Sequence, residues 1–269
     1  MPKRALLLIS LLIFILSFSA LALADNWHKE FQLTGMPELN LRVDDTHVRI
    51  EPWDKNYVSV DVTTENMKLG QSPGELEIHD YQRDNFVEIT MKERGVHFSI
   101  GWSRSRRSET MIRMPAKAKL DIQTSDGSLM VSRMNGEFRL RTSDGRLTAE
   151  DLDGILDAST SDGRLTVSGK FSALNTHTSD GRMEVTVAPG SAMMRSWSMR
   201  TGDGGIRLRL PKDFNADLDV HTGDGHLDVE MPVTVSGRIG GHEMRGKLGS
   251  GGELLTVRSG DGSVVISST

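Results

Sequence analysis

Apolar and polar residues alternate on both sides of a four-residue turn sequence that recurs along the chain. T-S-D-G occurs at 124–127, 142–145, 160–163 and 178–181, so its interval is 18 residues. T-G-D-G follows at 201–204 and 222–225, and S-G-D-G at 259–262, at longer intervals of 23, 21 and 37 residues. Period-two alternation entering and leaving an Asp-Gly turn is typical of two half-buried strands.

The alternation places apolar residues in the same column of every unit. The residues two positions after each turn glycine are Leu129, Leu147, Leu165, Met183, Ile206, Leu227 and Val264. One strand–turn–strand unit cannot bury its apolar face alone, but stacked units build a continuous core. We therefore predict that Leu147, Leu165 and Met183 form one inward stack.

The fold class predicted is all-β, a parallel β-solenoid in the form of a flattened β-helix or β-roll with rungs of about 18 residues. A second turn candidate falls halfway along the regular rungs, at 135–136, 153–154 and 168–169. A consecutive antiparallel meander is the alternative, because Asp-Gly is also a hairpin signal. In either case Gly145 and Gly163 are expected to have positive φ.

The chain divides into three segments. Residues 1–24 resemble a signal peptide, with Lys3 and Arg4, an apolar run and an Ala-x-Ala site ending at Ala24. An uncleaved anchor is the alternative. Residues 25–115 are predicted to form an N-terminal β region and irregular cap, with a weaker repeat copy around Asp45-Thr46, and residues 116–269 the repeat solenoid with a Gly-rich insertion at 233–254.

Composition narrows the class of protein. There is no cysteine, so core packing and backbone pairing must supply the stability. The net charge of −5 becomes −7 once Lys3 and Arg4 leave, which disfavours nucleic-acid binding. No later segment approaches the roughly 20 apolar residues of a membrane helix. We expect an exported protein, located in the periplasm, at the cell surface or outside the cell.

The serial T-S-D-G and T-G-D-G turns, each followed by Leu-x-Val or its equivalent, resemble the bacterial DUF4097 family of β-strand repeat proteins, an adhesin-like family. Two strand–Pro–strand segments, around Pro115 and Pro211, share the family's pattern. The resemblance covers roughly residues 36 to 269. It implies a β-solenoid located at the cell envelope and a role in adhesion.

The row of turn aspartates is the first candidate site. Stacked carboxylates at Asp126, Asp144, Asp162 and Asp180, continued by Asp203, Asp224 and Asp261, could bind calcium. Ordinary turn chemistry is the competing explanation, since Asp bonds nearby backbone and Gly supplies positive φ. On that explanation Arg146, Arg164 and Arg182 offset the repulsion between neighbouring carboxylates.

A second candidate is a metal cluster of His221, Asp224 and His226, with His177 one or two rungs away; plain surface histidines are the alternative. The sequence contains no H-E-x-x-H or P-loop motif, and its G-x-S-x-G match at 70–74 (G-Q-S-P-G) is interpreted as a turn. We therefore predict no enzyme, no catalytic residues and no cofactor other than calcium in the alternative above.

The function predicted is a non-catalytic exported structural or interaction protein with an adhesive role, whose partner is a protein or glycan of the cell envelope. A periplasmic accessory module for envelope sensing is one alternative. A calcium-dependent binding protein is the other.

Overall fold

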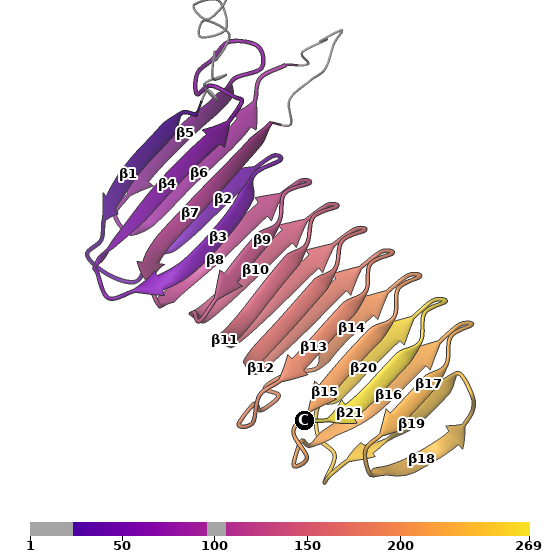
Figure 1. Ribbon diagram of the computed structural model, residues 1–269. Coiled ribbons are helices and arrows are strands. Elements are labelled where there is room, and N and C mark those ends of the chain that lie inside the picture. The colour runs from indigo at the N-terminus through magenta and orange to yellow at the C-terminus, as the bar shows by residue number, and fades with distance from the viewer. Residues whose placement is uncertain (1–23, 96–105) are drawn as a thin grey trace, which may run out of the picture.

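The computed structural model describes residues 24–95 and 106–269, and every regular element in that part of the chain is a β-strand (Figure 1). The signal-peptide prediction for residues 1–24 falls outside these residues, apart from Ala24. Within the same residues, no helix is long and apolar enough to cross a membrane.

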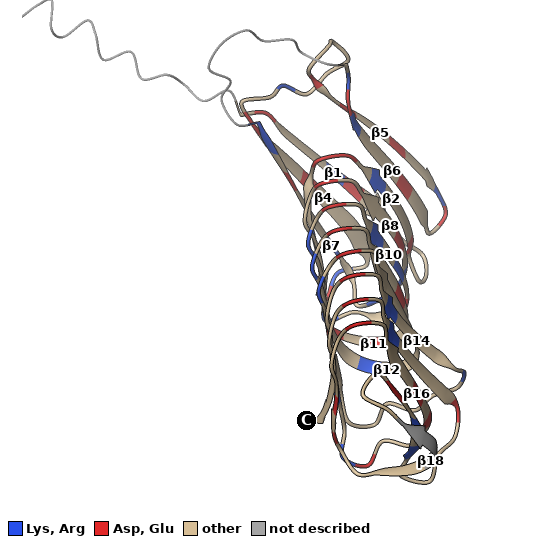
Figure 2. Cartoon of the chain, turned by 90° about the vertical axis from the view of Figure 1, so that its right-hand side faces the viewer, with Lys and Arg blue, Asp and Glu red and all other residues tan. Residues whose placement is uncertain are grey.

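The strands form two layers joined by the repeated turns, and Figure 2 views these layers from the turn edge. Strands that run into the turns belong to what we name the entry sheet. Its order is β5 (Leu76–Arg83), β6 (Phe86–Glu93), β2 (Glu38–Val43), β8 (Lys117–Thr124), β10 (Asn135–Thr142), the second half of β11 (Leu147–Thr160), the second half of β12 (Leu165–Thr178), β14 (Trp197–Thr201), β20 (Leu254–Ser259), β16 (Ala216–Thr222), β19 (Glu243–Leu248) and β18 (Val233–Ile239).

Strands that leave the turns belong to the exit sheet. Its order is β1 (Asn26–Gln32), β4 (Tyr57–Glu65), β7 (Arg107–Pro115), β3 (His47–Trp53), β9 (Leu129–Ser132), the first halves of β11 and β12, β13 (Met183–Val187), β15 (Ile206–Leu210), β21 (Val264–Ser268) and β17 (Leu227–Glu230). Residues 25–115 and 116–269 therefore contribute strands to both sheets.

The solenoid prediction is confirmed, and so is its central stack. Leu147 pairs with Leu165, and Leu165 pairs with Met183, in parallel register. All three side chains have no exposed surface. The 18-residue interval thus sets the register between rungs, and the antiparallel meander is ruled out for the regular units because their pairing is parallel.

The order of the rungs in space departs from the order along the chain at both ends. The last rung, β20–β21, lies between the rung β14–β15 and the rung β16–β17. Likewise, β2–β3 lies between β6–β7 and β8–β9. At each end of the repeat, one rung therefore lies between two other rungs of the stack and not at its outer edge.

The second corner of the regular rungs is a bend in a continuous strand in β11 and β12, and a two-residue break between β9 and β10. In β11 and β12 the backbone passes from one sheet to the other without leaving the strand. Left-handed backbone is concentrated here, with φ of 57° at Arg133, 52° at Asp151, 141° at Gly136 and 136° at Gly154. The halfway glycines of the sequence thus mark this corner.

Antiparallel strands cover three of the sheet ends. At the N-terminal end, β1 and β4 extend the exit sheet and β5 extends the entry sheet. At the C-terminal end, the insertion 233–254 supplies the β18–β19 hairpin, and β19 pairs antiparallel with β16. Antiparallel caps of this kind end a stack of parallel rungs and limit further strand addition.

Candidate functional site

The turn edge is held together by a row of buried threonine hydroxyls. Thr142, Thr160 and Thr178 each donate to a serine carbonyl of the preceding turn, at 2.9, 2.9 and 2.8 Å. The same hydroxyls of Thr160 and Thr178 accept from the amide of the glycine three residues later, at 3.2 and 3.0 Å. The first letter of T-S-D-G is therefore a structural contact between rungs, which the sequence pattern alone did not reveal.

The turn glycines meet a different requirement from the one predicted. Neither Gly145 nor Gly163 has positive φ, so that expectation was wrong. A Cβ on Gly163 would instead come well under 3.0 Å from the carbonyl oxygen of Gly145, and the same contact recurs from turn to turn. Glycine is needed because consecutive turns stack with their backbones in close approach.

The first turn of the stack shows where this requirement ends. Thr46 occupies the glycine position of its turn, and a Cβ on Gly127 would collide with its carbonyl oxygen. On its other side, the hydroxyl of Thr46 meets that of Ser108 at 2.7 Å. The neighbouring strands β6 and β7 are not joined by a four-residue turn, which explains why a side chain is accommodated here.

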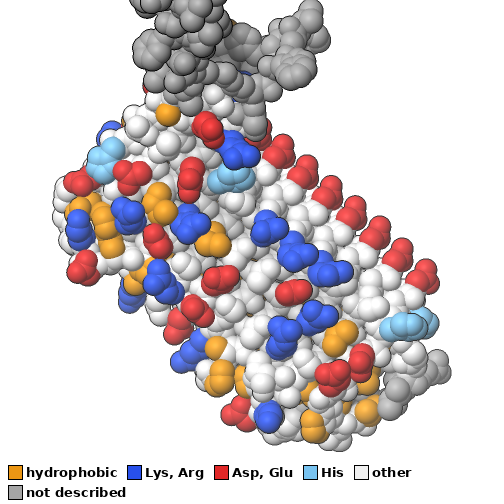
Figure 3. Space-filling model, viewed as in Figure 1, with side chains coloured by type: hydrophobic (Ala, Val, Ile, Leu, Met, Phe, Trp, Pro, Cys, Tyr) orange, Lys and Arg blue, Asp and Glu red, His pale blue; other side chains and the backbone are white. Residues whose placement is uncertain are grey.

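The seven turn aspartates form an exposed row along this edge, where Figure 3 shows a line of acidic side chains. None of these carboxylates makes a side-chain hydrogen bond or ion pair with another residue in the described part of the chain. Arg146, Arg164 and Arg182 lie one residue after three of the turns and are also unpaired. Direct ion pairing therefore does not provide the expected charge compensation.

The histidine cluster is not assembled as predicted. His221 lies on β16 and His226 directly precedes β17, on opposite sides of one turn, and both are exposed. In the entry sheet His177 pairs with Arg200, Arg200 with Arg258, and Arg258 with His221, so His177 is three rungs from His221. The intercalated rung β20–β21 creates this separation. Across residues 24–95 and 106–269, no group of three His, Cys, Asp or Glu residues could hold a metal ion.

The outer face of the entry sheet carries a long concave surface, which we name the outer groove. It consists of two adjoining hollows of about 370 and 420 Å³ that share Asp157 and Asn175. Its polar and charged lining comes from β2, β8, β10, β11, β12 and β14 and from the loop before β14. These residues are Glu38, Asn40, Lys119, Asp121, Glu137, Arg139, Asp157, Asn175, Thr176, His177, Arg195, Ser198 and Arg200.

Ion pairs fill the N-terminal half of the outer groove. Asp121 contacts Arg42 at 3.2 Å and Arg139 at 3.6 Å. Lys119 donates to Glu38 at 2.7 Å, and this hydrogen bond raises the pKa of the Lys119 ammonium. These ion pairs between neighbouring strands hold the charged side chains against one another.

The C-terminal half of the outer groove carries polar side chains that have no partner among the described residues. The side chains of Asp157, Asn175, His177 and Arg200 form no hydrogen bond or ion pair with any described residue. Donors and acceptors that the chain leaves unsatisfied can bind a polar partner without first breaking an internal contact. In the sequence these residues belong only to the outward columns, which gave no signal of a site.

Similar folds occur among solved structures. A "putative cell adhesion protein" from Clostridium sporogenes is 13% identical, with a TM-score of 0.40, covering 92% of this chain and 100% of its own. A "putative adhesin" from Bacteroides fragilis is 7% identical, with a TM-score of 0.35, covering 91% and 97%. A "putative lipid binding protein" from Parabacteroides distasonis is 14% identical, with a TM-score of 0.39, covering 90% and 96%.

No curated protein matches the sequence. The model of one protein family does match, over residues 36–231. That range runs from the residue before Pro37 to the end of the rung β16–β17, and it contains both halves of the outer groove. The chain belongs to the Toastrack DUF4097 family.

Proposed function

We propose that this chain is an exported, non-catalytic binding module of the bacterial cell envelope with an adhesive role, and that the outer groove is its interaction surface. The observation that carries the proposal is the set of unpaired polar side chains at Asp157, Asn175, His177 and Arg200, on adjoining strands of a rigid sheet. They lie along the solenoid axis, so an extended partner could meet them in turn.

The arrangement suits binding better than catalysis. A hydrolytic site needs two carboxylates, or a base and a metal ion, converging on one reacting bond. In the open half of the groove Asp157 and Asn175 are instead neighbours across adjacent strands, as are His177 and Arg200, and each pair is spaced by strand separation, about 4.8 Å per rung. Such spacing favours many weak polar contacts with a long partner, such as a glycan chain or an extended protein segment.

A groove variant tests the proposal. The change Asp157→Ala, Asn175→Ala, His177→Ala and Arg200→Ala removes the unpaired groups and leaves the inward columns intact. Labelled protein would be measured for retention on isolated cell envelopes of the source bacterium. We expect the variant to lose most of its retention. A matched variant of the exit sheet, Arg146→Ala, Arg164→Ala and Arg182→Ala, should keep it.

Retention of the groove variant at the level of the unmodified protein would contradict the proposal. Location separates adhesion from the alternative role in periplasmic sensing. Protease added to intact cells should degrade an adhesin displayed at the surface. A chain protected until the outer envelope is opened would favour the periplasmic role.

A further inference from the structure

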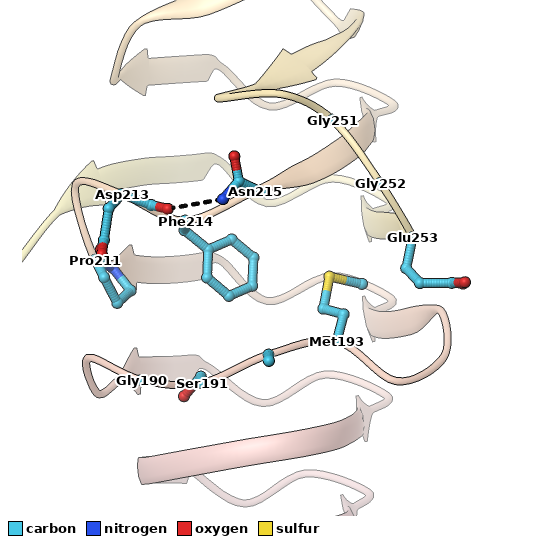
Figure 4. A pocket seen from close by; sticks show the side chains of 11 residues that line it. Gly190, Ser191, Met193, Pro211, Asp213, Phe214, Asn215, Gly251, Gly252 and Glu253 are labelled. Atoms are coloured by element: carbon cyan, nitrogen blue, oxygen red, sulfur yellow. Dashed lines mark hydrogen bonds between the residues drawn. The ribbon is translucent and has the colours of Figure 1, made fainter.

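A pocket lies at the edge opposite the repeated turns, where three irregular loops converge (Figure 4). The loops are 188–196, 211–215 and 249–253. They fall within the three intervals that lengthen the repeat from 18 to 23, 21 and 37 residues. The intercalation of β20–β21 brings the third loop beside the other two. The departures from the repeat therefore gather at one place, which we name the loop pocket.

The loops are fixed by their own hydrogen bonds. Asn215 is the main anchor, because its Oδ1 accepts from the amide and the hydroxyl of Ser250, at 2.8 and 3.0 Å. Its Nδ2 donates to the carbonyl of Asp213 at 3.1 Å. In the first loop the Ser191 hydroxyl donates to the carbonyl of Ala188 at 2.8 Å. A pocket whose walls are already ordered loses little entropy when a ligand binds.

The lining combines an apolar side with an acceptor-rich rim. Phe214 is held by Trp197, with ring centroids 5.4 Å apart, and Met193 is half-buried nearby. Figure 4 shows Asp213 and Glu253 on opposite sides of the pocket, with Phe214 and Met193 between them. Neither carboxylate takes part in an ion pair with a described residue. Three glycines, at 190, 251 and 252, also line the pocket.

We propose that the loop pocket binds a single sugar residue, such as the end of a glycan chain. A pyranose ring presents C–H groups on one face and hydroxyl groups around its edge. Half-buried Met193, which lies beside the buried ring of Phe214, matches the apolar face, while Asp213, Glu253 and loop carbonyls can accept hydrogen bonds from the hydroxyls. The volume of about 390 Å³ is in the range of small-molecule sites, roughly 300–1,000 Å³.

A neutral ligand fits the charges better than a cation does. Two lysine side chains approach glycines of the loop pocket. A Cβ on Gly190 would meet Cε and Nζ of Lys170 at 3.4 and 3.7 Å, and a Cβ on Gly251 would meet Cδ of Lys247 at 3.0 Å, so the surroundings of the pocket are not purely acidic. The loop pocket shares no lining residue with the outer groove, so the inference does not depend on the proposed function.

Saturation-transfer NMR on the mature chain would test the inference. The probes are D-glucose, D-galactose, D-mannose and N-acetyl-D-glucosamine at millimolar concentration, with choline and putrescine as cationic comparisons. We expect transfer to at least one sugar. The double variant Asp213→Asn and Glu253→Gln should weaken that binding at least about tenfold, because two charged acceptors are lost. Asp224→Asn, at the opposite edge, should not change it.

A thermal melt of each variant separates loss of binding from loss of fold. The inference is overturned if no sugar in the panel shows transfer, or if the double variant binds as well as the unmodified chain. Transfer to choline or putrescine without any sugar would also overturn it, because the pocket would then select for positive charge.

Discussion

The hydroxyl of Thr160 donates a hydrogen bond to the carbonyl oxygen of Ser143, one rung earlier in the stack, at 2.9 Å. The same hydroxyl accepts from the amide of Gly163 in its own turn, at 3.2 Å. One buried atom thus ties two consecutive turns together. Since this contact recurs at Thr142 and Thr178, it accounts for the threonine of the repeat.

Replacing Thr160 by Val should therefore destabilise the protein, although the side chains have nearly the same shape. The change leaves the buried Gly163 amide without its acceptor, while the Ser143 carbonyl keeps the amides of Ser161 and Asp162. An unsatisfied buried amide lowers the free energy of unfolding by about 1–3 kcal/mol. Urea unfolding measures the loss. Thr160→Ser keeps the hydroxyl and should be milder, as the Ser259 hydroxyl also donates to a carbonyl of a neighbouring turn, that of Gly204, at 2.9 Å. Equal losses in the two variants would exclude this role for the hydroxyl.

The close stacking of turns makes a specific prediction for Gly163→Ala. The added methyl group would overlap the carbonyl of Gly145, and backbone on both sides prevents an easy adjustment. Overpacking of this kind lowers the free energy of unfolding by about 1–3 kcal/mol or more. The neighbouring change Arg164→Ala should stay within about 0.5 kcal/mol, because that side chain is exposed and unpaired. Similar denaturation midpoints for both variants would argue against the packing explanation.

The inward column predicts a loss of about 2–5 kcal/mol for Leu165→Ala. Leu165 has no exposed surface and lies between Leu147 and Met183 in the stack. A cavity there would affect three rungs at once. Thr166→Ala, the next residue and on the outward face, is the matched control for chemical denaturation and should change stability little. A small effect of Leu165→Ala would mean that the column can collapse around the missing side chain.

We predict that the melting temperature does not depend on calcium. A specific calcium site on the native state would raise it as the ion exceeds its dissociation constant. Bound calcium takes six to eight oxygen ligands, and the turn aspartates are single outward carboxylates on successive rungs. The measurement is a thermal melt in chelator and again in millimolar calcium. A rise of many degrees with calcium would make the aspartate row an ion-binding surface.

The regular part of the fold could be predicted from the sequence because its information is local. Alternation fixes which side chains point inward, and the constant offset fixes which of them stack, as Leu147, Leu165 and Met183 do. The prediction of positive φ for the turn glycines was wrong because it considered the D-G pair in isolation. The actual restriction on Gly163 comes from the backbone of another rung, which no local pattern contains.

The candidate sites could be predicted far less well. The sequence shows three lengthened intervals but not that their loops meet, since this depends on β20–β21 entering the stack between earlier rungs. The S-G-D-G turn at 259–262 could pair with any rung, because every rung offers the same backbone edge. The same ambiguity explains why His177 was expected near His221. The outer groove was not recognised for another reason, because its polar residues occupy ordinary outward positions of the rungs.

The position of β20–β21 also determines the order in which the rungs can pair during folding. A chain that leaves the ribosome from its N-terminus delivers β14–β15 and β16–β17 before the rung that separates them. The regular rungs between β8 and β13 can form as they emerge, since each pairs with its predecessor. The C-terminal rungs keep two open strand edges until residues 254–268 arrive. The stack, and the pocket beside it, can therefore be completed only after synthesis of the preceding chain.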